Sequence, residues 1–398
     1  MPLSPEDILE QVARLERQPN VETPSLQELR RRAEAFGART QWGSYNFVSS
    51  VKNRSAGLTV YIGSERVRQR TLNPRQREIL NNWQHTAGAV LRYIQRAPLL
   101  RAERTMGQNN DFSPRCSLFV SVHRPEMVRL SYMVCQTLFE PRAEGSPHQH
   151  LVYVPEWPEM NRQILVFPEV NVTLVLGSDY YGEAKKGFLR MAMWNAKQRG
   201  MLGLHAGSKT ARAVDQRSGK MQQVAMVLFG LTATGKTTHA CHDHGLNLPG
   251  EGIAIAQDDV VFLRPDAGTL GTERGFYLKT EGLEPTNQPL IYRAATSRDT
   301  IFENVMVDYE GGVDFNDTTL TANGRGVMQR DDFGEYKGES INTPPAGEVD
   351  RCLIIFIIRR NTVVPLLAKL SPEQLAATFM LGESVESSGG DPRRVGEI

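Results

Sequence analysis

The sequence lacks long apolar segments. Its longest uninterrupted apolar run, residues 352–358, is far shorter than the about 20 residues that a helix needs to cross a bilayer. The opening stretch MPLSPEDILEQVARL has neither a basic region nor an apolar core of the kind found in secretory signals. These absences exclude an obvious membrane anchor, and we expect a cytoplasmic protein.

The sequence also lacks paired cysteines and an excess of charge. Its four cysteines, Cys116, Cys135, Cys241 and Cys352, form no C-x-x-C pair, which argues against a disulfide framework or a zinc ribbon. The formal net charge of +1 argues against a nucleic-acid-binding surface. With 40% apolar and 23% charged residues over 398 positions, the chain has an ordinary globular composition and enough length for two domains.

Repeats and low-complexity tracts are absent as well, so the order of elements has to come from periodicity. Ile8, Val12 and Leu15 recur at helical spacing, and Ser25 is a predicted N-cap of a second helix. Strand and helix patterns then alternate through the centre, which predicts an α/β architecture. The predicted units are N-terminal helices (1–40), a substrate-binding domain (41–203), a nucleotide-binding domain (204–385) and a flexible tail (386–398).

The strongest signal is FGLTATGKTT at 229–238. It fits G-x-x-x-x-G-K-[ST], a loop whose backbone N–H groups surround phosphates while Lys binds them and Thr reaches Mg²⁺. The preceding QQVAMVLF reads as a buried strand, and the following residues can begin a helix, as the motif requires. The predicted nucleotide contacts are Gly230, Leu231, Thr232, Ala233, Thr234, Gly235, Lys236, Thr237 and Thr238.

A second signal, GIAIAQDD, is an apolar strand that ends in Asp258 and Asp259. Such a strand delivers carboxylates to the sheet edge where nucleotide enzymes hold a metal, although a pair of surface aspartates in a turn would look the same. A third stretch, HACHDH at 239–244, offers possible metal ligands. Four ligands within six residues rarely close a tetrahedron alone, so a partly exposed helix end is the favoured interpretation.

Two further segments are ambiguous alone. YYGEAKKG places Tyr180, Lys185 and Lys186 at a helix start, and MLGLH ends in His205. Lysine pairs usually belong to a solvated helix face, and a lone histidine is more often structural.

Taken in order, these motifs resemble those of ATP-dependent phosphoenolpyruvate carboxykinases. That family carries Y-x-G-E-x-K-K-G, M-x-x-H, G-L-S-G-T-G-K-T-T and G-D-D, which here read YYGEAKKG, MLGLH, GLTATGKTT and AQDD. ENVMVDYEGGVDFNDTTLTANGR and AKLSPEQ also resemble family signatures, and the resemblance covers about residues 54–382. It implies a mixed α/β substrate domain followed by a phosphate-loop mononucleotide-binding domain.

The resemblance implies a reaction and its cofactors. Oxaloacetate and ATP would be converted reversibly into phosphoenolpyruvate, ADP and CO₂, the first step of gluconeogenesis, by a monomer that binds neither nucleic acid nor membranes. Mn²⁺ would be bound by Lys186, His205 and Asp259, and Mg²⁺ would accompany ATP and contact Thr237. A lysine ligand has to be neutral, so burial and a neighbouring cation should lower its pKa.

Carboxylate-binding and phosphate-binding roles also follow from the resemblance. Arg54, Tyr180 and Arg325 would bind substrate, with Arg325 bridging the γ-phosphate and the enolate oxygen. Lys236 would follow the charge that moves between the β- and γ-phosphates, and Glu284 would contact the nucleotide. Lys186, Lys236 and Arg325 are thus the predicted catalytic residues.

The sequence departs from the family pattern at several places. Thr232 and Ala233 replace Ser-Gly in the loop, and Val260 and Val261 follow the acidic pair where the family has Glu-His. The family continues for more than a hundred residues with adenine contacts, so we expect a truncated nucleotide domain here. Two other functions stay open: a phosphate-loop kinase for a small molecule or protein, and a non-catalytic nucleotide-binding remnant.

Overall fold

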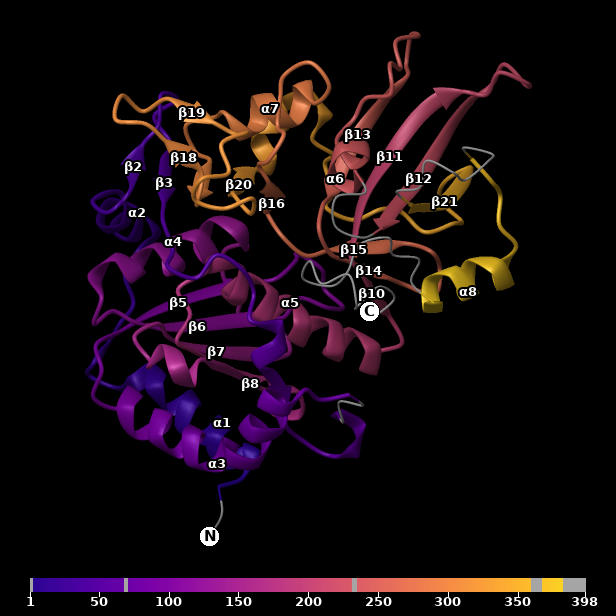
Figure 1. Ribbon diagram of the computed structural model, residues 1–398. Coiled ribbons are helices and arrows are strands. Elements are labelled where there is room, and N and C mark those ends of the chain that lie inside the picture. Colours follow the sequence, from indigo (N-terminus) through magenta and orange to yellow (C-terminus); the bar gives the residue numbers. More distant parts are fainter. Residues whose placement is uncertain (1–2, 68–70, 231–234, 359–366, 382–398) are drawn as a thin grey trace.

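A mixed seven-stranded sheet forms the centre of the N-terminal part of the chain in the computed structural model, which describes residues 3–67, 71–230, 235–358 and 367–381 (Figure 1). The strands lie in the order β1-β5-β6-β7-β9-β8-β4. Their bounds are β1 (Val21–Glu22), β4 (Thr59–Tyr61), β5 (Leu99–Thr105), β6 (Arg115–Ser121), β7 (His148–Val154), β8 (Gln163–Phe167) and β9 (Val172–Leu176).

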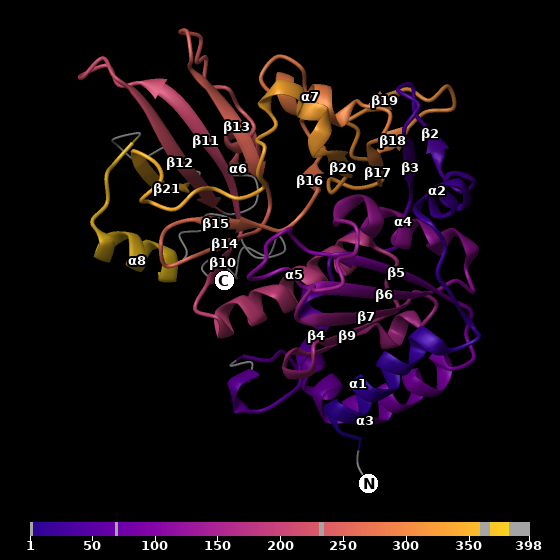
Figure 2. The same ribbon diagram turned by 180° about the vertical axis from the view of Figure 1, so that it is seen from behind.

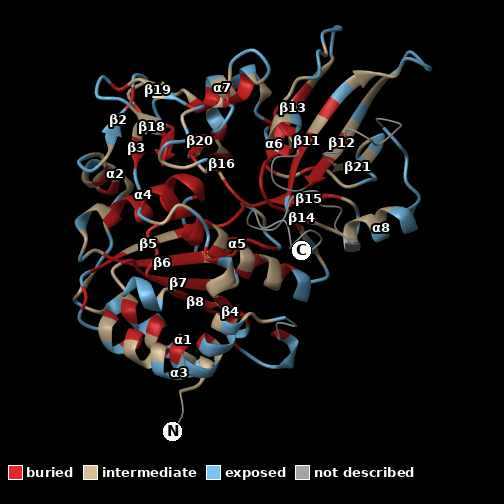
Figure 3. Cartoon of the chain, in the orientation of Figure 1, coloured by how far each residue is buried: buried red, intermediate tan, exposed pale blue. Residues whose placement is uncertain are grey.

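Helices cover both faces of this sheet, because successive side chains of each strand point to opposite faces and both sets are apolar. Phe119 and Val152 pack with α1 (Pro5–Ala13) and α3 (Pro74–Ile94). Their neighbours Leu118 and Leu151 pack with α4 (Val128–Thr137) and α5 (Tyr181–Gln198) on the other face. Figure 2 shows the same arrangement from behind, and Figure 3 shows that the strands of the sheet and α4 are largely buried.

Helix starts follow the capping rules. The predicted N-cap Ser25 is confirmed, because its hydroxyl accepts a hydrogen bond from the N–H of Glu28 (3.2 Å) at the start of α2 (Leu26–Glu34). Asn73 caps α3 in the same way, with Pro74 in the first helical position. The chain also forms 3-10 turns: η1 (Arg14–Arg17), η2 (Ala56–Leu58), η3 (Glu65–Val67), η4 (Pro125–Met127), η5 (Glu159–Asn161), η6 (Pro168–Val170) and η7 (Arg330–Tyr336).

The C-terminal part contains a four-stranded sheet of order β13-β11-β12-β21, with the short α6 (Lys236–Ala240) beside it (Figure 1). β12 (Met221–Gly230) is antiparallel to β11 (Ala206–Val214) and parallel to β21 (Arg351–Ile357), and β13 (Gly252–Gln257) is antiparallel to β11. β12 and β13 therefore run in the same direction. The remaining helices are α7 (Pro289–Ala295) and α8 (Pro372–Leu381).

A five-stranded sheet, β16-β20-β17-β3-β2, joins segments that are distant in sequence. β3 (Tyr45–Phe47) pairs with β17 (Ile301–Glu303), and β2 (Ala38–Arg39) pairs with β3, so residues between β1 and β4 of the seven-stranded sheet contribute to the C-terminal region. The other strands are β10 (Leu202–Leu204), β14 (Val261–Leu263), β15 (Thr269–Gly271), β16 (Gly275–Lys279), β18 (Met306–Val307), β19 (Val313–Asp314) and β20 (Arg325–Gln329). None of the helices in the described ranges is long and apolar enough to cross a membrane.

A buried ion pair ties the two regions together. Arg129 on α4 donates to the Glu303 carboxylate on β17 (Nη1–Oε1 2.9 Å), and both side chains are almost fully buried. The same carboxylate oxygen accepts the N–H of Tyr181 (2.9 Å), and Arg129 also donates to the carbonyl of Asp179. The N-terminus of α5 is thus fixed against the C-terminal region.

We expect Arg129→Met to destabilise the chain by about 3–5 kcal/mol, because it leaves the Glu303 carboxylate buried without a cation. Chemical unfolding in urea measures the change. The control is Arg14→Met, which breaks the exposed Arg14–Glu10 pair on the surface of the N-terminal helix and should leave the unfolding midpoint unchanged. Equal midpoints for both variants would contradict this account of the ion pair.

Candidate active site

One edge of the four-stranded sheet collects three of the predicted segments. Ala206, the first residue of β11, pairs with Phe229 near the end of β12, and Ser208 pairs with Gln257 at the end of β13. His205 therefore precedes the start of β11, and the phosphate loop and the acidic pair follow the ends of β12 and β13. All three lie at the same edge of the sheet. This is the edge at which α/β sheets bind ligands.

The described part of the phosphate loop contacts the first aspartate. Gly235 has a left-handed φ of +88° and precedes α6, whose first residues are Lys236 and Thr237. Thr237 donates to Asp258 (Oγ1–Oδ2 2.9 Å), and Lys236 Nζ lies 4.0 Å from Oδ1 of the same carboxylate. Leu231, Thr232, Ala233 and Thr234 lie outside the described residues.

The second aspartate gathers a different set of groups. Lys186 Nζ donates to both oxygens of Asp259 (2.7 Å each), and His205 Nε2 lies 2.9 Å from Oδ1. Lys185 also donates to Asp259, and it lies 3.0 Å from the buried Glu273 carboxylate. The three predicted metal ligands thus meet from α5, the start of β11 and the end of β13.

Burial and charge set the protonation states in this cluster. Burial, with the neighbouring Lys185, lowers the pKa of Lys186 to about 8 although Asp259 opposes it. Lys236 and burial lower the pKa of His205 to about 4. Burial alone would raise the pKa of Asp259, but Lys185 and Lys186 outweigh it and hold that pKa well below its usual range. The cluster therefore contains a neutral imidazole, an ionised carboxylate and an amine that loses its proton readily.

Asp259 has a strained backbone. Its φ of +79° lies in the left-handed region, which costs a non-glycine residue about 1–3 kcal/mol. The fully buried Gln257 holds the turn: its amide donates to the carbonyl of Asp258 (2.7 Å) and accepts the N–H groups of Thr272 and Glu273 (3.1 Å each). Such strain is typical of residues whose position matters for function.

The predicted substrate residues Tyr180 and Arg325 lie together through two residues that the sequence did not single out. Arg325 donates to Asn323 (2.5 Å), and Asn323 donates to the Tyr180 hydroxyl (3.1 Å). The Lys185 ammonium and the Arg325 guanidinium lie 5.1 Å and 5.4 Å from the centroid of the Tyr277 ring, and the Tyr277 hydroxyl donates to Tyr180 (3.0 Å).

Arg54 belongs to a loop that is anchored at the start of α5. The Asp179 carboxylate accepts the N–H groups of Ser50 (2.8 Å) and Val51 (2.9 Å), and the N–H of Ser55 donates to Glu183 on α5. Arg54 itself is exposed, and its guanidinium has no hydrogen-bond partner among the described residues.

Comparison with known proteins decides the family. The family model described as phosphoenolpyruvate carboxykinase matches residues 16–396. A curated relative named phosphoenolpyruvate carboxykinase (ATP), from Aeropyrum pernix, is 34% identical over 375 residues, which cover 92% of this chain and 70% of the relative. The chain belongs to the phosphoenolpyruvate carboxykinase family. The fold expected from the resemblance is confirmed as a mixed α/β arrangement with several sheets.

Within this carboxykinase chain, Glu284 lies in a turn beside the loop helix. Its carboxylate accepts the N–H of Asn287 (2.7 Å), and Gln288 in the same turn donates to Thr238 (2.8 Å). Glu284 is thus close to the phosphate loop in the fold but is not a member of the Asp259 cluster.

The departures at Val260 and Val261 have a packing explanation. Both side chains are buried, and Val260 belongs to the core formed by α4 and α5, so apolar residues suit these positions. The histidine-rich stretch is also explained. The fully buried Lys209 donates to the carbonyls of His239 (2.5 Å) and His242 (2.9 Å) and lies 2.6 Å from His244 Nε2, so these residues surround a lysine beside a helix end.

We expect Lys185→Met to destabilise the carboxykinase by about 3–5 kcal/mol, because Glu273 and Asp259 would share the site with one cation fewer. The measurement is urea unfolding of the full chain in EDTA. Lys186→Met is the matched control. The Lys186 side chain is 20% exposed and contacts Asp259 but not Glu273, so this variant should lose clearly less stability than Lys185→Met. Equal losses for the two variants would contradict the structural role of Lys185.

Proposed function

We propose that this chain converts oxaloacetate and ATP reversibly into phosphoenolpyruvate, ADP and CO₂, the activity for which its family is named. The observation that carries the proposal is the convergence of Lys186 and His205 on the Asp259 carboxylate, beside a phosphate loop whose Thr237 contacts the adjacent Asp258. The family resemblance implies that an amine, an imidazole and a carboxylate bind the cation that stabilises the enolate next to the nucleotide site.

The donor chemistry of the cluster fits a divalent cation. His205 is neutral at neutral pH, Lys186 loses its proton more easily than an ordinary lysine, and Asp259 is ionised. Two nitrogen donors and one carboxylate oxygen are thus available from three elements. We assign Mn²⁺ to Lys186, His205 and Asp259, with the choice of metal taken from the family resemblance. When bound there, the ion would supply positive charge beside the substrate oxygen that becomes negative as CO₂ leaves.

The second carboxylate suits the cation that accompanies ATP. In phosphate-loop enzymes the loop hydroxyl and a strand-end aspartate hold Mg²⁺. Here the Thr237 hydroxyl contacts one oxygen of Asp258, and the other oxygen is buried with no hydrogen-bond partner among the described residues. We therefore assign Mg²⁺ to Thr237, as the sequence predicts, and add Asp258 as its partner.

The remaining residues would bind and orient the two substrates. Lys236, whose Nζ lies 4.0 Å from Asp258 Oδ1, would stabilise charge on the β- and γ-phosphates. Arg325 and Tyr180, joined through Asn323, would fix a substrate carboxylate and the oxygen that attacks the γ-phosphorus. Arg54 would supply a second cation from a loop that is anchored on α5.

The lysine–histidine–aspartate cluster distinguishes this proposal from the two other functions. A phosphate-loop kinase needs the loop and Asp258 but has no use for two lysines and a histidine on Asp259. A nucleotide-binding remnant would not need the strained backbone of Asp259, whose φ is +79°.

The test is a coupled assay of the full chain with oxaloacetate, ATP, Mg²⁺ and Mn²⁺. We expect CO₂ release and phosphoenolpyruvate formation, loss of both with EDTA, and a fall of kcat/KM by about 10²–10³-fold in Lys186→Ala, the usual effect of losing one group that stabilises transition-state charge. Lys197→Ala, an exposed lysine in the last turn of the same helix, should keep full activity.

Each alternative has its own result in this assay. Phosphoryl transfer without CO₂ release would identify a kinase, and tight ATP binding without turnover in Mn²⁺ would identify a remnant. Unchanged activity of Lys186→Ala would remove the metal assignment even if the chain were a carboxykinase.

Tyr277 should position the substrate-binding residues. Tyr277→Phe keeps the ring near Lys185 and Arg325 but loses the hydroxyl hydrogen bond to Tyr180, so kcat/KM should fall by about twofold to tenfold. Tyr277→Leu also loses the contacts of the ring with both cations, so its kcat/KM should be lower still. Tyr309→Phe, whose side chain is 95% exposed, is the control. Wild-type activity in both Tyr277 variants would contradict the role.

A further inference from the structure

Three potential metal ligands meet far from the proposed active site. Glu16 on η1 and His148 and His150 on β7 offer one ligand atom each, and these atoms lie within 4.8 Å of one another. The two histidines stand two residues apart on a strand, so their side chains project from the same face. The backbone thus presents a His-x-His pair to Glu16.

The cluster contains a polar atom that needs a partner. His150 is only 4% exposed, and its buried Nδ1 has no hydrogen-bond partner in the described parts of the chain. Buried ring nitrogens are nearly always paired, so an unpaired one suggests a ligand. His148 is already oriented, because its Nε2 lies 2.9 Å from the hydroxyl of Ser117 on β6. A partner of this kind fixes the ring of a metal-binding histidine and leaves its other nitrogen available.

Neighbouring charges allow Glu16 to turn toward an ion. Arg101 contacts Glu16 (2.9 Å) but also Glu103, and Glu103 is paired with Arg115 as well (2.5 Å). If Glu16 left Arg101, that arginine would keep Glu103. Burial, with a contribution from His148, lowers the pKa of His150 to about 3, so its ring is neutral at neutral pH and no proton has to leave.

We propose that Glu16, His148 and His150 form a second metal site, which binds a transition-metal dication of the Zn²⁺ class. Two imidazoles and one carboxylate are a three-ligand set for Zn²⁺, with a fourth position open to water. Tetrahedral bonds of about 2.0–2.2 Å place ligand atoms about 3.3–3.6 Å apart, so the distances between the ligand atoms would shorten by about 1.5 Å at most. The two arginines oppose the ion's charge and set its affinity below that of a site without cations.

This site is separate from the proposed catalytic centre. His148 is the first residue of β7, and His150 pairs with Val172 at the start of the parallel β9, whereas Lys186 follows the opposite end of β9. The histidines also project on the side of α1 and α3, and α5 with Lys186 covers the other face (Figure 1). Bound metal would therefore tie η1 to the sheet and stabilise the N-terminal region without entering the reaction.

The test measures Zn²⁺ binding to the full chain by equilibrium dialysis and metal analysis, in a His205→Ala background that breaks the catalytic donor set. We expect one bound equivalent of Zn²⁺. His148→Ala, His150→Gln and Glu16→Gln should each lower its affinity by at least about tenfold, because even the loss of a group that supports a ligand has an effect of this size. Co²⁺ used as a spectroscopic probe should show visible d–d bands that disappear in the same variants. Zn²⁺ should also raise the melting temperature of the background protein.

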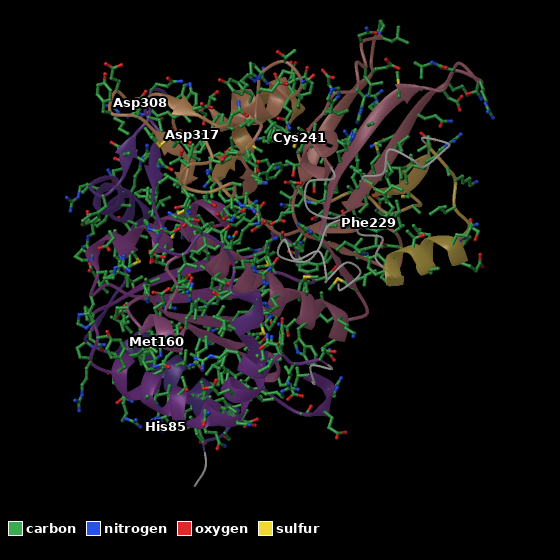
Figure 4. The ribbon with its side chains drawn as sticks, viewed as in Figure 1. His85, Met160, Phe229, Cys241, Asp308 and Asp317 are labelled. Atoms are coloured by element: carbon green, nitrogen blue, oxygen red, sulfur yellow. The ribbon has the colours of Figure 1, made fainter. Side chains whose placement is uncertain are left out.

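The control is His85→Ala, an exposed histidine on the outer side of α3, which should bind Zn²⁺ like its parent (Figure 4). In the otherwise unchanged chain, the Glu16, His148 and His150 variants should retain carboxykinase activity and so prove to be folded. Equal Zn²⁺ binding by all variants, or no bound equivalent in the His205→Ala background, would overturn the proposal.

Discussion

The Asp259 carboxylate is the constraint on which the proposed active site depends. A buried carboxylate needs compensating charge, and this one receives it from Lys185 and Lys186, while the neutral His205 lies 2.9 Å from one of its oxygens. These partners belong to α5, which covers the N-terminal sheet, and to the segment before β11. Compensating one buried charge therefore brings two regions of the chain together. Burial in this cluster, with Lys185 beside it, lowers the pKa of Lys186 although Asp259 opposes the shift, which suits Lys186 to the proposed role of metal ligand.

Local signals made much of this site predictable. The phosphate loop and the acidic pair are contiguous motifs, and each predicts that a strand ends just before it. The contacts of Tyr277, Asn323 and Glu273 escaped prediction because they involve partners that are distant in sequence: the Tyr277 ring lies near the Lys185 and Arg325 cations. An aromatic residue in a strand is ordinarily core, and the sequence contains nothing that distinguishes this one.

The fold shows the same division. The helix start at Ser25 could be predicted, because a cap is a contact between residues three positions apart. The pairing of β3 with β17 could not, since Phe47 and Glu303 are partners across 256 positions and strand pairing leaves no local mark. Yet that pairing matters for the site: Glu303 accepts the N–H of Tyr181 and so fixes the start of the helix that carries Lys186.

Two adjacent aspartates contact two different groups of residues because the backbone bends where they lie. Both follow Gln257, the last residue of β13. Asp258 faces Thr237 of the phosphate loop, and the left-handed backbone at Asp259 directs its carboxylate to Lys186 and His205. Because a single peptide bond joins the two residues, the positions of the two proposed cations are coupled. A distortion of this turn would therefore displace the nucleotide side and the substrate side together, which explains why Gln257 holds it with three hydrogen bonds.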